Sequence, residues 1–259
     1  MKKYYFTLAS AVLLTSAAHA QGTELFFSEY DEGAHQSGIT YNGAASASTG
    51  NERAIEIYNP TTSVVNLAPY SVRRYSNGSR TVVEEERLIR RNSTANTINS
   101  RATFVLANGE ATLPNILSAA NQLSAGYQTA GPSVILLGGV TYFNGDDAMA
   151  LVRYPSGTAG VGPGVIGDLI GVIGEQPLLA NGNTGGNWSG TNTADGATPP
   201  LVSSANQSII RRSTVSRGVR YNPTPQNVPR SNPPGRQTGG AHLATAVTTL
   251  ATGLNGPFP

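Results

Sequence analysis

The sequence predicts an all-β protein built as a β-sandwich. Short runs of apolar and β-branched residues recur through its middle, each bounded by Gly, Pro, Asn or Ser, and this pattern is typical of strands. In one run Ile55 and Ile57 alternate with Glu56, so a strand places the isoleucines on one face and the carboxylate on the other. We therefore expect packed sheets with one solvent-facing side.

Most of these runs are expected to be strands. In chain order they are Glu24–Tyr30, Arg53–Asn59, Tyr70–Tyr75, Glu86–Arg90, Ala102–Ala107, Ser133–Leu137, Ala148–Tyr154, Val165–Ile173 and Gln207–Arg212. Asn59-Pro60 should end the second strand, because proline cannot donate a hydrogen bond to a neighbouring strand. Asn144-Gly145 predicts a hairpin turn between Val140–Phe143 and Ala148–Leu151, since both turn residues tolerate positive φ.

Helical spacing occurs in one segment, Thr112–Leu123, and predicts a single short helix there. Two stretches, Ala34–Gly50 and Leu178–Ser204, consist mostly of small and polar residues and are expected to be loops. The second contains Trp188, the only tryptophan. We expect this side chain to be buried under the loop and to cap the sandwich, although an exposed tryptophan could instead stack on a sugar.

The chain divides into three parts. Residues 1–20 have the features of a secretory signal peptide: Lys2 and Lys3, a mostly apolar stretch, and the small residues of Ala18-His19-Ala20. Residues 21–218 contain the expected strands, and the Pro/Gly-rich residues 219–259 should form an extended tail. No later run of about 20 apolar residues offers a membrane span. We therefore expect a protein that is secreted or located at the cell surface or in the periplasm.

Cysteine and charge content limit the possible functions. The chain has no cysteine, which excludes disulfides, thiolate metal sites and cysteine nucleophiles. Lys2 and Lys3 are its only lysines, so their removal would leave fifteen arginines against 15 acidic residues. Such a neutral chain supports nucleic-acid binding weakly, because that function needs clustered positive charge. Adjacent arginines such as Arg73-Arg74 should point to opposite faces of a strand and make cross-strand ion pairs.

Several segments occur in the order of a known family. They are Leu25–Gly33, Asn51–Pro60, Val64–Leu67, Tyr70–Gly78, Phe104–Asn108, Phe143–Leu151, Asp168–Gly174, Asn187-Trp188 and Ser208–Arg212. Together they resemble the lamin tail domain in its bacterial, secreted form. The resemblance extends from Thr23 to Gly218 and implies an immunoglobulin-like β-sandwich, in agreement with the strands expected from the residue pattern.

The resemblance implies an exported, non-catalytic binding or scaffolding module that holds an unidentified protein or cell-surface partner. In bacteria such domains often stand beside nucleases or phosphatases. An accessory role in extracellular nucleic-acid processing, with a separately encoded nuclease, is therefore an alternative, and a metal-dependent hydrolase is another. Histidine catalysis is not expected, because His35 lies in a loop-like insert and His242 in the tail, where neither has fixed partners.

Five acidic residues in the family-like segments are candidate metal ligands: Glu29, Glu56, Asp146, Asp147 and Asp168. Their carboxylates would suit Ca²⁺ or Mg²⁺. The alternative is structural. Asp146 and Asp147 would then accept hydrogen bonds from turn amides, and Glu29 and Glu56 would pair across strands with Arg73, Arg74, Arg153 or Arg211. No cofactor is expected unless these carboxylates gather around Ca²⁺.

The signal sequence makes a testable prediction about export. Cleavage between Ala20 and Gln21 is expected, so the mature protein found outside the cytoplasm should begin at Gln21. Mass spectrometry of exported material measures this terminus. Recovery of an intact Met1 terminus from that fraction would contradict the prediction.

Overall fold

Alternate residues of the central strands face a common core, as the period of two in the sequence predicts. The computed structural model describes residues 22–32, 40–41, 44–45, 51–177, 188–191, 201–204, 208–211, 215–225 and 247–250, and the expected signal peptide lies outside them. On β4 (Arg53–Tyr58), Ile55 and Ile57 are fully buried in the core. Glu56 lies on the opposite face but is also buried. The prediction that this face is exposed to solvent is therefore wrong for β4.

Two sheets build the sandwich. The first contains, in spatial order, β10 (Gln122–Leu123), β9 (Thr103–Ala107), β4, β1 (Phe26–Glu32), β16 (Ser208–Arg211) and β17 (Val247–Leu250). Its pairings are antiparallel except that of β10 with β9. The second, fully antiparallel sheet contains β11 (Val134–Leu136), β7 (Glu84–Arg87), β6 (Tyr70–Tyr75), β12 (Ala148–Arg153) and β13 (Val165–Ile170).

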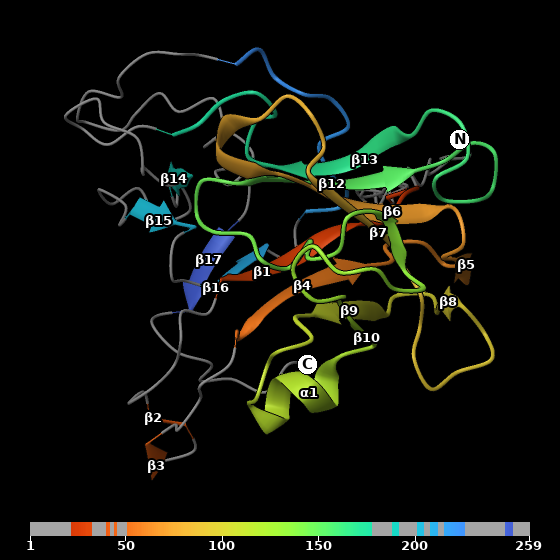
Figure 1. Ribbon diagram of the computed structural model, residues 1–259, viewed down its shortest axis with the longest axis horizontal. Coiled ribbons are helices and arrows are strands. Elements are labelled where there is room, and N and C mark those ends of the chain that lie inside the picture. The colour runs from red at the N-terminus through yellow and green to blue at the C-terminus, as the bar shows by residue number, and fades with distance from the viewer. Residues whose placement is uncertain are drawn as a thin grey trace, which may run out of the picture.

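The main core lies between these sheets, which Figure 1 shows one above the other. Phe27, Ile57 and Phe104 of the first sheet are buried in one cluster with Met149 and Leu151 of the second. Burying one such side chain contributes about 1.5–3 kcal/mol to folding. The hydrophobic core therefore supplies the main driving force of a domain that has no disulfide to support it.

Helix α1 (Pro114–Ala119) packs on the outer side of the first sheet, where Ile116 joins Val105 in a second apolar cluster. Pro114 occupies the first helical turn, where the missing N–H costs nothing. The helix is shorter than the expected Thr112–Leu123. It ends because Ala120 is extended, with ψ 124°, and the chain continues into β10.

Short elements complete the described part of the chain. A 3₁₀ turn, η1 (Ser76–Gly78), follows β6. Three small antiparallel pairs join β2 (Thr40–Tyr41) with β3 (Ala44–Ala45), β5 (Val65–Asn66) with β8 (Thr97–Ile98), and β14 (Ser189–Thr191) with β15 (Leu201–Ser203). The stretches expected to be loops therefore contain two of these pairs.

All of the strands expected from the sequence are present, with ends shifted by a few residues. The predicted hairpin at Asn144-Gly145 is wrong. The chain does turn there, because the Asp147 N–H donates to the Asn144 carbonyl at 3.0 Å. However, Val140–Phe143 forms no strand, and β12 pairs with β6 and β13 instead. Phe143 is fully buried against Tyr30, so this segment fills the core rather than pairing with a strand.

Part of the segment expected to be a free tail belongs to the sandwich. The Val219 N–H donates to Asp168 at 2.7 Å, and the Asn222 side chain bonds both the N–H and the carbonyl of Ile173, at 2.8 and 3.0 Å. Residues 247–250 form β17, which pairs with β16. The described residues from 219 to 225 contain no helix or strand, as expected, but they are bonded to the second sheet.

Asp168 joins segments that are far apart in the sequence. Its fully buried carboxylate accepts hydrogen bonds from the N–H groups of Phe27 and Val219, at 2.8 and 2.7 Å, and forms an ion pair with Arg211 at 2.7 Å. It thereby connects β1, β13, β16 and the start of the tail. A carboxylate is needed here because every one of these groups is a donor.

Substitution Asp168→Asn should lower the free energy of unfolding by about 3 kcal/mol, because it leaves Arg211, whose side chain is only 10% exposed, without its counter-charge. It would also turn an amide N–H₂ toward donors that it cannot satisfy. Urea denaturation followed by circular dichroism measures the change. The control is Arg153→Gln, which removes the partly exposed pair with Glu24 and should cost under about 1 kcal/mol. Equal losses in the two variants would contradict the assigned role of Asp168.

Candidate functional site

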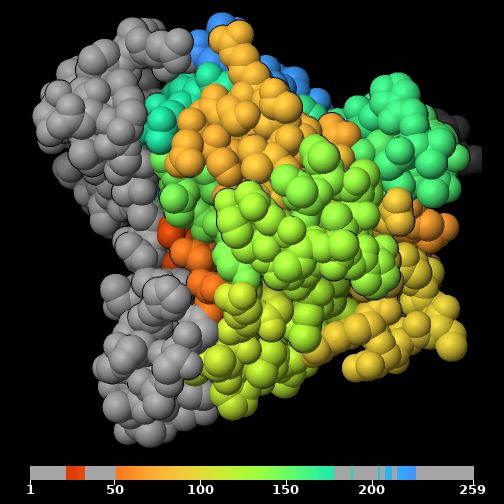
Figure 2. All heavy atoms as spheres, viewed as in Figure 1, coloured from red at the N-terminus to blue at the C-terminus, as the bar shows by residue number. Residues whose placement is uncertain are grey.

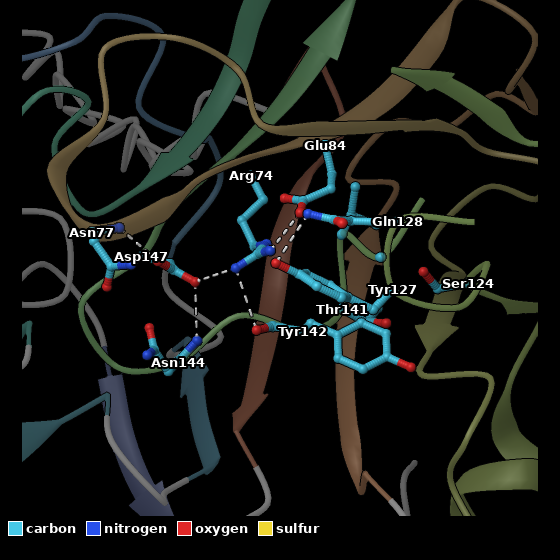
Figure 3. Close-up of polar contacts among 12 residues, drawn as sticks. Arg74, Asn77, Glu84, Ser124, Tyr127, Gln128, Thr141, Tyr142, Asn144 and Asp147 are labelled. Carbon is cyan, nitrogen blue, oxygen red and sulfur yellow. Dashed lines mark hydrogen bonds and ion pairs between the residues drawn. The ribbon is translucent and has the colours of Figure 1, made fainter. Parts of the chain in front are cut away.

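Charged residues gather between the sheets at one end of the sandwich (Figure 3). Arg74 of β6 donates to Glu84 of β7 at 2.6 Å and to Asp147 at 2.9 Å, and it also reaches the Tyr142 carbonyl at 3.4 Å. All three charged side chains are buried. Alternation along β6 places Arg74 on this inner side, whereas its neighbour Arg73 pairs with Glu85 at 3.0 Å on the outer side. The predicted cross-strand use of this arginine pair is confirmed.

Asp147 extends this charged group to the neighbouring turns. Its carboxylate accepts from the N–H groups of Asn77 and Asn144, at 2.9 and 3.2 Å, as predicted for an acid in a turn. Its carbonyl accepts from the indole N–H of Trp188 at 2.9 Å. Trp188 is fully buried against Gly171, where a Cβ would lie 2.6 Å from the indole ring. The prediction that this tryptophan is buried is confirmed.

Burial and pairing oppose each other in the electrostatics of this group. Burial raises the pKa of both Glu84 and Asp147, and Arg74 counteracts the rise in each. Burial alone would lower the pKa of Arg74, but its hydrogen bond with Glu84 and the charge of Asp147 outweigh that effect and raise it. The arginine therefore stays charged and is held by two acids.

Glu86 organises the segment that closes this end of the sandwich. It lies on β7 two residues after Glu84 and is fully buried. Its carboxylate accepts from both sides of that segment: the hydroxyls of Ser124 and Ser133 at 2.6 and 2.9 Å, and the N–H groups of Ala125, Gly139 and Val140 at 3.1, 3.0 and 3.4 Å. These charge-assisted bonds fix residues 124–140 in one conformation.

On the outside, the fixed segment presents large apolar side chains to solvent. Tyr127, Leu136 and Leu137 are 51%, 43% and 45% exposed, and we call them the apolar platform. The backbone segments that carry them are paired, because the Gln128 N–H donates to the Gly138 carbonyl at 3.0 Å, and the ring of Tyr127 lies 5.5 Å from that of Tyr142. Figure 2 shows the green atoms of this region in the middle of the visible face.

The backbone beneath the apolar platform is strained. Leu137 and Gln128 have φ values of +40° and +51°, which side chains with a Cβ rarely adopt. Such a conformation costs roughly 1–2 kcal/mol per residue relative to a right-handed one. Gly139, at φ +105°, leaves little room for a side chain, since a Cβ would lie 3.0 Å from the Tyr127 Cα. The surrounding bonds therefore hold an exposed leucine in a costly conformation, and such strain is found most often at functional sites.

The sequence interpretation missed this surface. A signal for it was present, because no Asp, Glu, Lys, Arg or His occurs between Ala111 and Gly145, although charged residues make up 12% of the chain. This uncharged segment is the part of the sequence that contains Tyr127, Leu136 and Leu137. The strain at Leu137 has no counterpart in the sequence.

The five acidic residues predicted as metal ligands lie in separate places. Glu29 and Glu56 are directly opposite each other on β1 and β4, Asp146 accepts from the Gln176 amide at 2.8 Å, and Asp147 and Asp168 make the bonds described above. In the part of the chain that the structure describes, no group of three or more His, Asp or Glu residues could hold a metal ion.

The alternative that Glu29 and Glu56 pair with arginines is wrong, because the four candidate arginines bind other acids. Arg153 pairs with Glu24 at 2.8 Å, Arg211 with Asp168, and Arg73 and Arg74 with the acids of β7. Glu56 instead accepts from the Ser28 hydroxyl at 2.6 Å. Burial, reinforced by Asp31 and Glu56, raises the pKa of Glu29 to about 8.

The family model of the Lamin Tail Domain matches residues 18–161. The chain belongs to the lamin tail domain family. This finding and the two packed sheets confirm the predicted family and the predicted fold class, an immunoglobulin-like β-sandwich with one short helix. The match to the lamin tail domain includes the apolar platform and ends before β13, so the family-like segments from Asp168 onward lie beyond it.

No curated protein matches the chain. Among solved structures, a DUF4876 family protein from Bacteroides thetaiotaomicron matches with a TM-score of 0.37 and 11% sequence identity, over 74% of this chain and 63% of that chain. This chain thus spans less than two thirds of the length of that protein. Within the described residues, no helix has both the length and the apolar character that a bilayer span requires.

The opposed carboxylates of β1 and β4 predict a pH-dependent stability. Folded Glu29 keeps its proton up to a pKa of about 8, whereas the ordinary value is 4.5. Stability should therefore be fully present below about pH 4.5 and be lost as the pH rises through 8, because the folded state then has to ionise a buried group. The pKa of Asp31, raised to about 7 mainly by burial, acts in the same direction.

Thermal unfolding across this pH range tests the prediction with Glu29→Gln, which mimics the protonated side chain. The melting temperature of the variant should fall less with rising pH than that of the natural protein. The exposed Thr94 provides the control, since Thr94→Ala changes no titratable group and should leave the slope unchanged. Parallel curves for all three proteins would rule out the assigned role of Glu29.

Proposed function

We propose that this protein is an exported, non-catalytic binding or scaffolding module whose contact surface is the apolar platform. The observation that carries the proposal is the exposure of Leu137, a large apolar side chain held at positive φ by a buried carboxylate network. Core packing does not require this side chain, because nearly half of it is in solvent. Its strain is explained if the side chain is displayed for a partner.

The composition of the surrounding surface supports a role in binding. The centres of protein interfaces are enriched in aromatic residues and depleted in charge, and the apolar platform has both properties. Its rigid support also matters. A surface that is already fixed loses little conformational entropy when it binds, so more of the contact energy appears as affinity.

The charged residues support a non-catalytic reading. Glu86, Asp147 and Asp168 are each saturated with protein donors, and the acid pair of Glu84 and Asp147 is occupied by Arg74. The two serine hydroxyls that donate to Glu86, those of Ser124 and Ser133, are buried together with it and tie the chain segments to one another. The nucleic-acid alternative is less well supported, because Arg73 and Arg74 are each paired with acids of β7.

Hydroxyl-radical labelling tests whether the apolar platform is covered by a partner. Labelling of Tyr127, Leu136 and Leu137 should be several-fold weaker in unfractionated exported material than in dilute purified protein, because an interface excludes solvent. Val161, which is 53% exposed outside the platform, is the internal control and should be labelled equally in both samples. Equal labelling of the platform in both samples would refute the proposed contact surface.

The variant Leu137→Gly separates contact from folding. Glycine adopts positive φ without strain, so the melting temperature should be maintained or should rise. Loss of the leucine side chain should nevertheless restore labelling of Tyr127 in exported material. A variant that unfolds, or that keeps the platform protected, would show that Leu137 serves the fold rather than the contact.

A further inference from the structure

We propose that Glu29, Asp31 and Glu56, which we call the carboxyl cluster, act as a pH switch that keeps β16 paired with β1 at acidic pH and releases residues 208–210 of β16 as the pH rises. The inference goes beyond the proposed function, because none of these acids belongs to the apolar platform. Three observations carry it: the burial of the acids side by side, the lack of a positive partner for Glu29, and their position where β1 pairs with β16.

The carboxyl cluster lies on the face of the first sheet that is turned away from the main core. Glu29 of β1 is directly opposite Glu56 of β4, and Asp31 follows Glu29 by two residues, so a strand places both on one side. All three acids are buried, with exposed fractions of 8% for Glu29, 7% for Glu56 and 2% for Asp31. Buried carboxylates this close repel each other, so the three groups cannot all ionise without a cost in free energy.

Glu29 has no group that compensates for a negative charge. Within the described residues its carboxyl group has neither a hydrogen-bond donor nor an ion-pair partner. The charged groups that act on it are Asp31 and Glu56, and both disfavour its ionised form. Helix α1, which packs on the same face of the sheet, contains no charged residue. Glu29 is therefore the member of the carboxyl cluster that ionises with most difficulty.

Asp31 is only partly compensated. Its Oδ1 accepts from the Ser208 hydroxyl of β16 at 2.6 Å, whereas its buried Oδ2 has no partner within the described residues. Where β4 begins, Glu52 disfavours and Arg53 favours the ionised form of Asp31. Arg211 of β16 contributes no compensation here, because it pairs with Asp168 at 2.7 Å.

This environment keeps protons on the carboxyl cluster near neutral pH. Burial, followed by the charges of Asp31 and Glu56, raises the pKa of Glu29 to about 8, and burial raises the pKa of Asp31 to about 7. If water reaches Glu29, its pKa returns toward the ordinary value of 4.5. The ratio of open to closed molecules should therefore rise by up to about tenfold per pH unit for each such group, and the contribution of Glu29 should level off above about pH 8.

The pairing of the strands determines which side opens. β4 pairs with β1 from Phe26 to Glu32 and with β9 on its other side, so it is held from both sides. β16 pairs with β1 only at Glu29, Tyr30 and Asp31, and its other neighbour is the edge strand β17. Separation of residues 208–210 thus admits water to the carboxyl cluster with the smallest loss of structure. The ion pair of Arg211 with Asp168 holds the far end of β16, so the opening stays local.

Hydrogen exchange followed by mass spectrometry, on the full mature protein from about pH 5 to about pH 9, tests the switch. Exchange rates are divided by the intrinsic rates at each pH, which gives a protection factor for each segment. Peptides that contain β16 should lose protection by about tenfold or more per pH unit up to about pH 8. Peptides from β9 and β12, which contain no member of the carboxyl cluster, should keep theirs.

Two variants assign the effect to the carboxyl cluster. Glu29→Gln should reduce the loss of protection in β16 at least about tenfold over the whole range, because it removes one of the two titrating groups. Glu56→Gln, whose amide oxygen can still accept from Ser28, keeps Glu29 but removes the opposing charge, so it should give a smaller reduction. It also tests the proposal if Glu29→Gln does not fold. Thr94→Ala, at an exposed site, should behave like the natural protein.

Three results would overturn the proposal. The first is protection of β16 that does not change with pH. The second is an equal loss in β16, β9 and β12, which would show global unfolding without a local switch. The third is a loss in the folded Glu29→Gln or Glu56→Gln variant that equals that of the natural protein.

Discussion

Around the hydrophobic core, the positions of the loops and edge strands depend on one type of interaction, the buried carboxylate that accepts several backbone N–H groups. Asp168 ties two strands of the first sheet to an edge strand of the second, and Glu86 gathers residues 124–140. Glu52 does the same before α1, where it accepts from the N–H groups of Thr112 and Leu113 at 2.9 and 3.2 Å. Each of these acids replaces several water molecules with fixed donors. The hydrogen bonds from these donors offset the free-energy cost of burying the charge of the carboxylate.

In residues 124–140, the groups that hold the segment in place and the side chains that it exposes lie on different sides. Residues 124–140 are fixed from the inside by Glu86, so their outer side is free to carry side chains that folding does not need. Leu136 and Leu137 are such side chains, exposed on a segment whose position is already determined. Immunoglobulin-like sandwiches generally place binding residues in the loops at one end of the sheets. In the proposed function, the apolar platform would follow the same principle with a segment that includes the edge strand β11.

The sequence predicted the strands well because their information is local. The alternation of Ile55, Glu56 and Ile57 is visible within a few residues, and it determines which side chains enter the core. Contacts between distant segments could not be predicted in this way. The acidic run Glu84-Glu85-Glu86 gives no sign that all three residues are buried, since the partners of Glu86 lie 38 to 54 positions away. The hairpin at Asn144-Gly145 failed for the same reason, because burial of Phe143 outweighed the local turn preference.

The use of buried carboxylates instead of disulfides to connect distant segments has a chemical consequence. Hydrogen bonds and ion pairs of Glu86, Asp147 and Asp168 involve no electron transfer, so reducing agents cannot break them. The domain can acquire its final structure without an oxidant, a disulfide isomerase or any search among alternative cysteine pairings. It should therefore fold equally well on either side of a membrane that separates reducing from oxidising conditions.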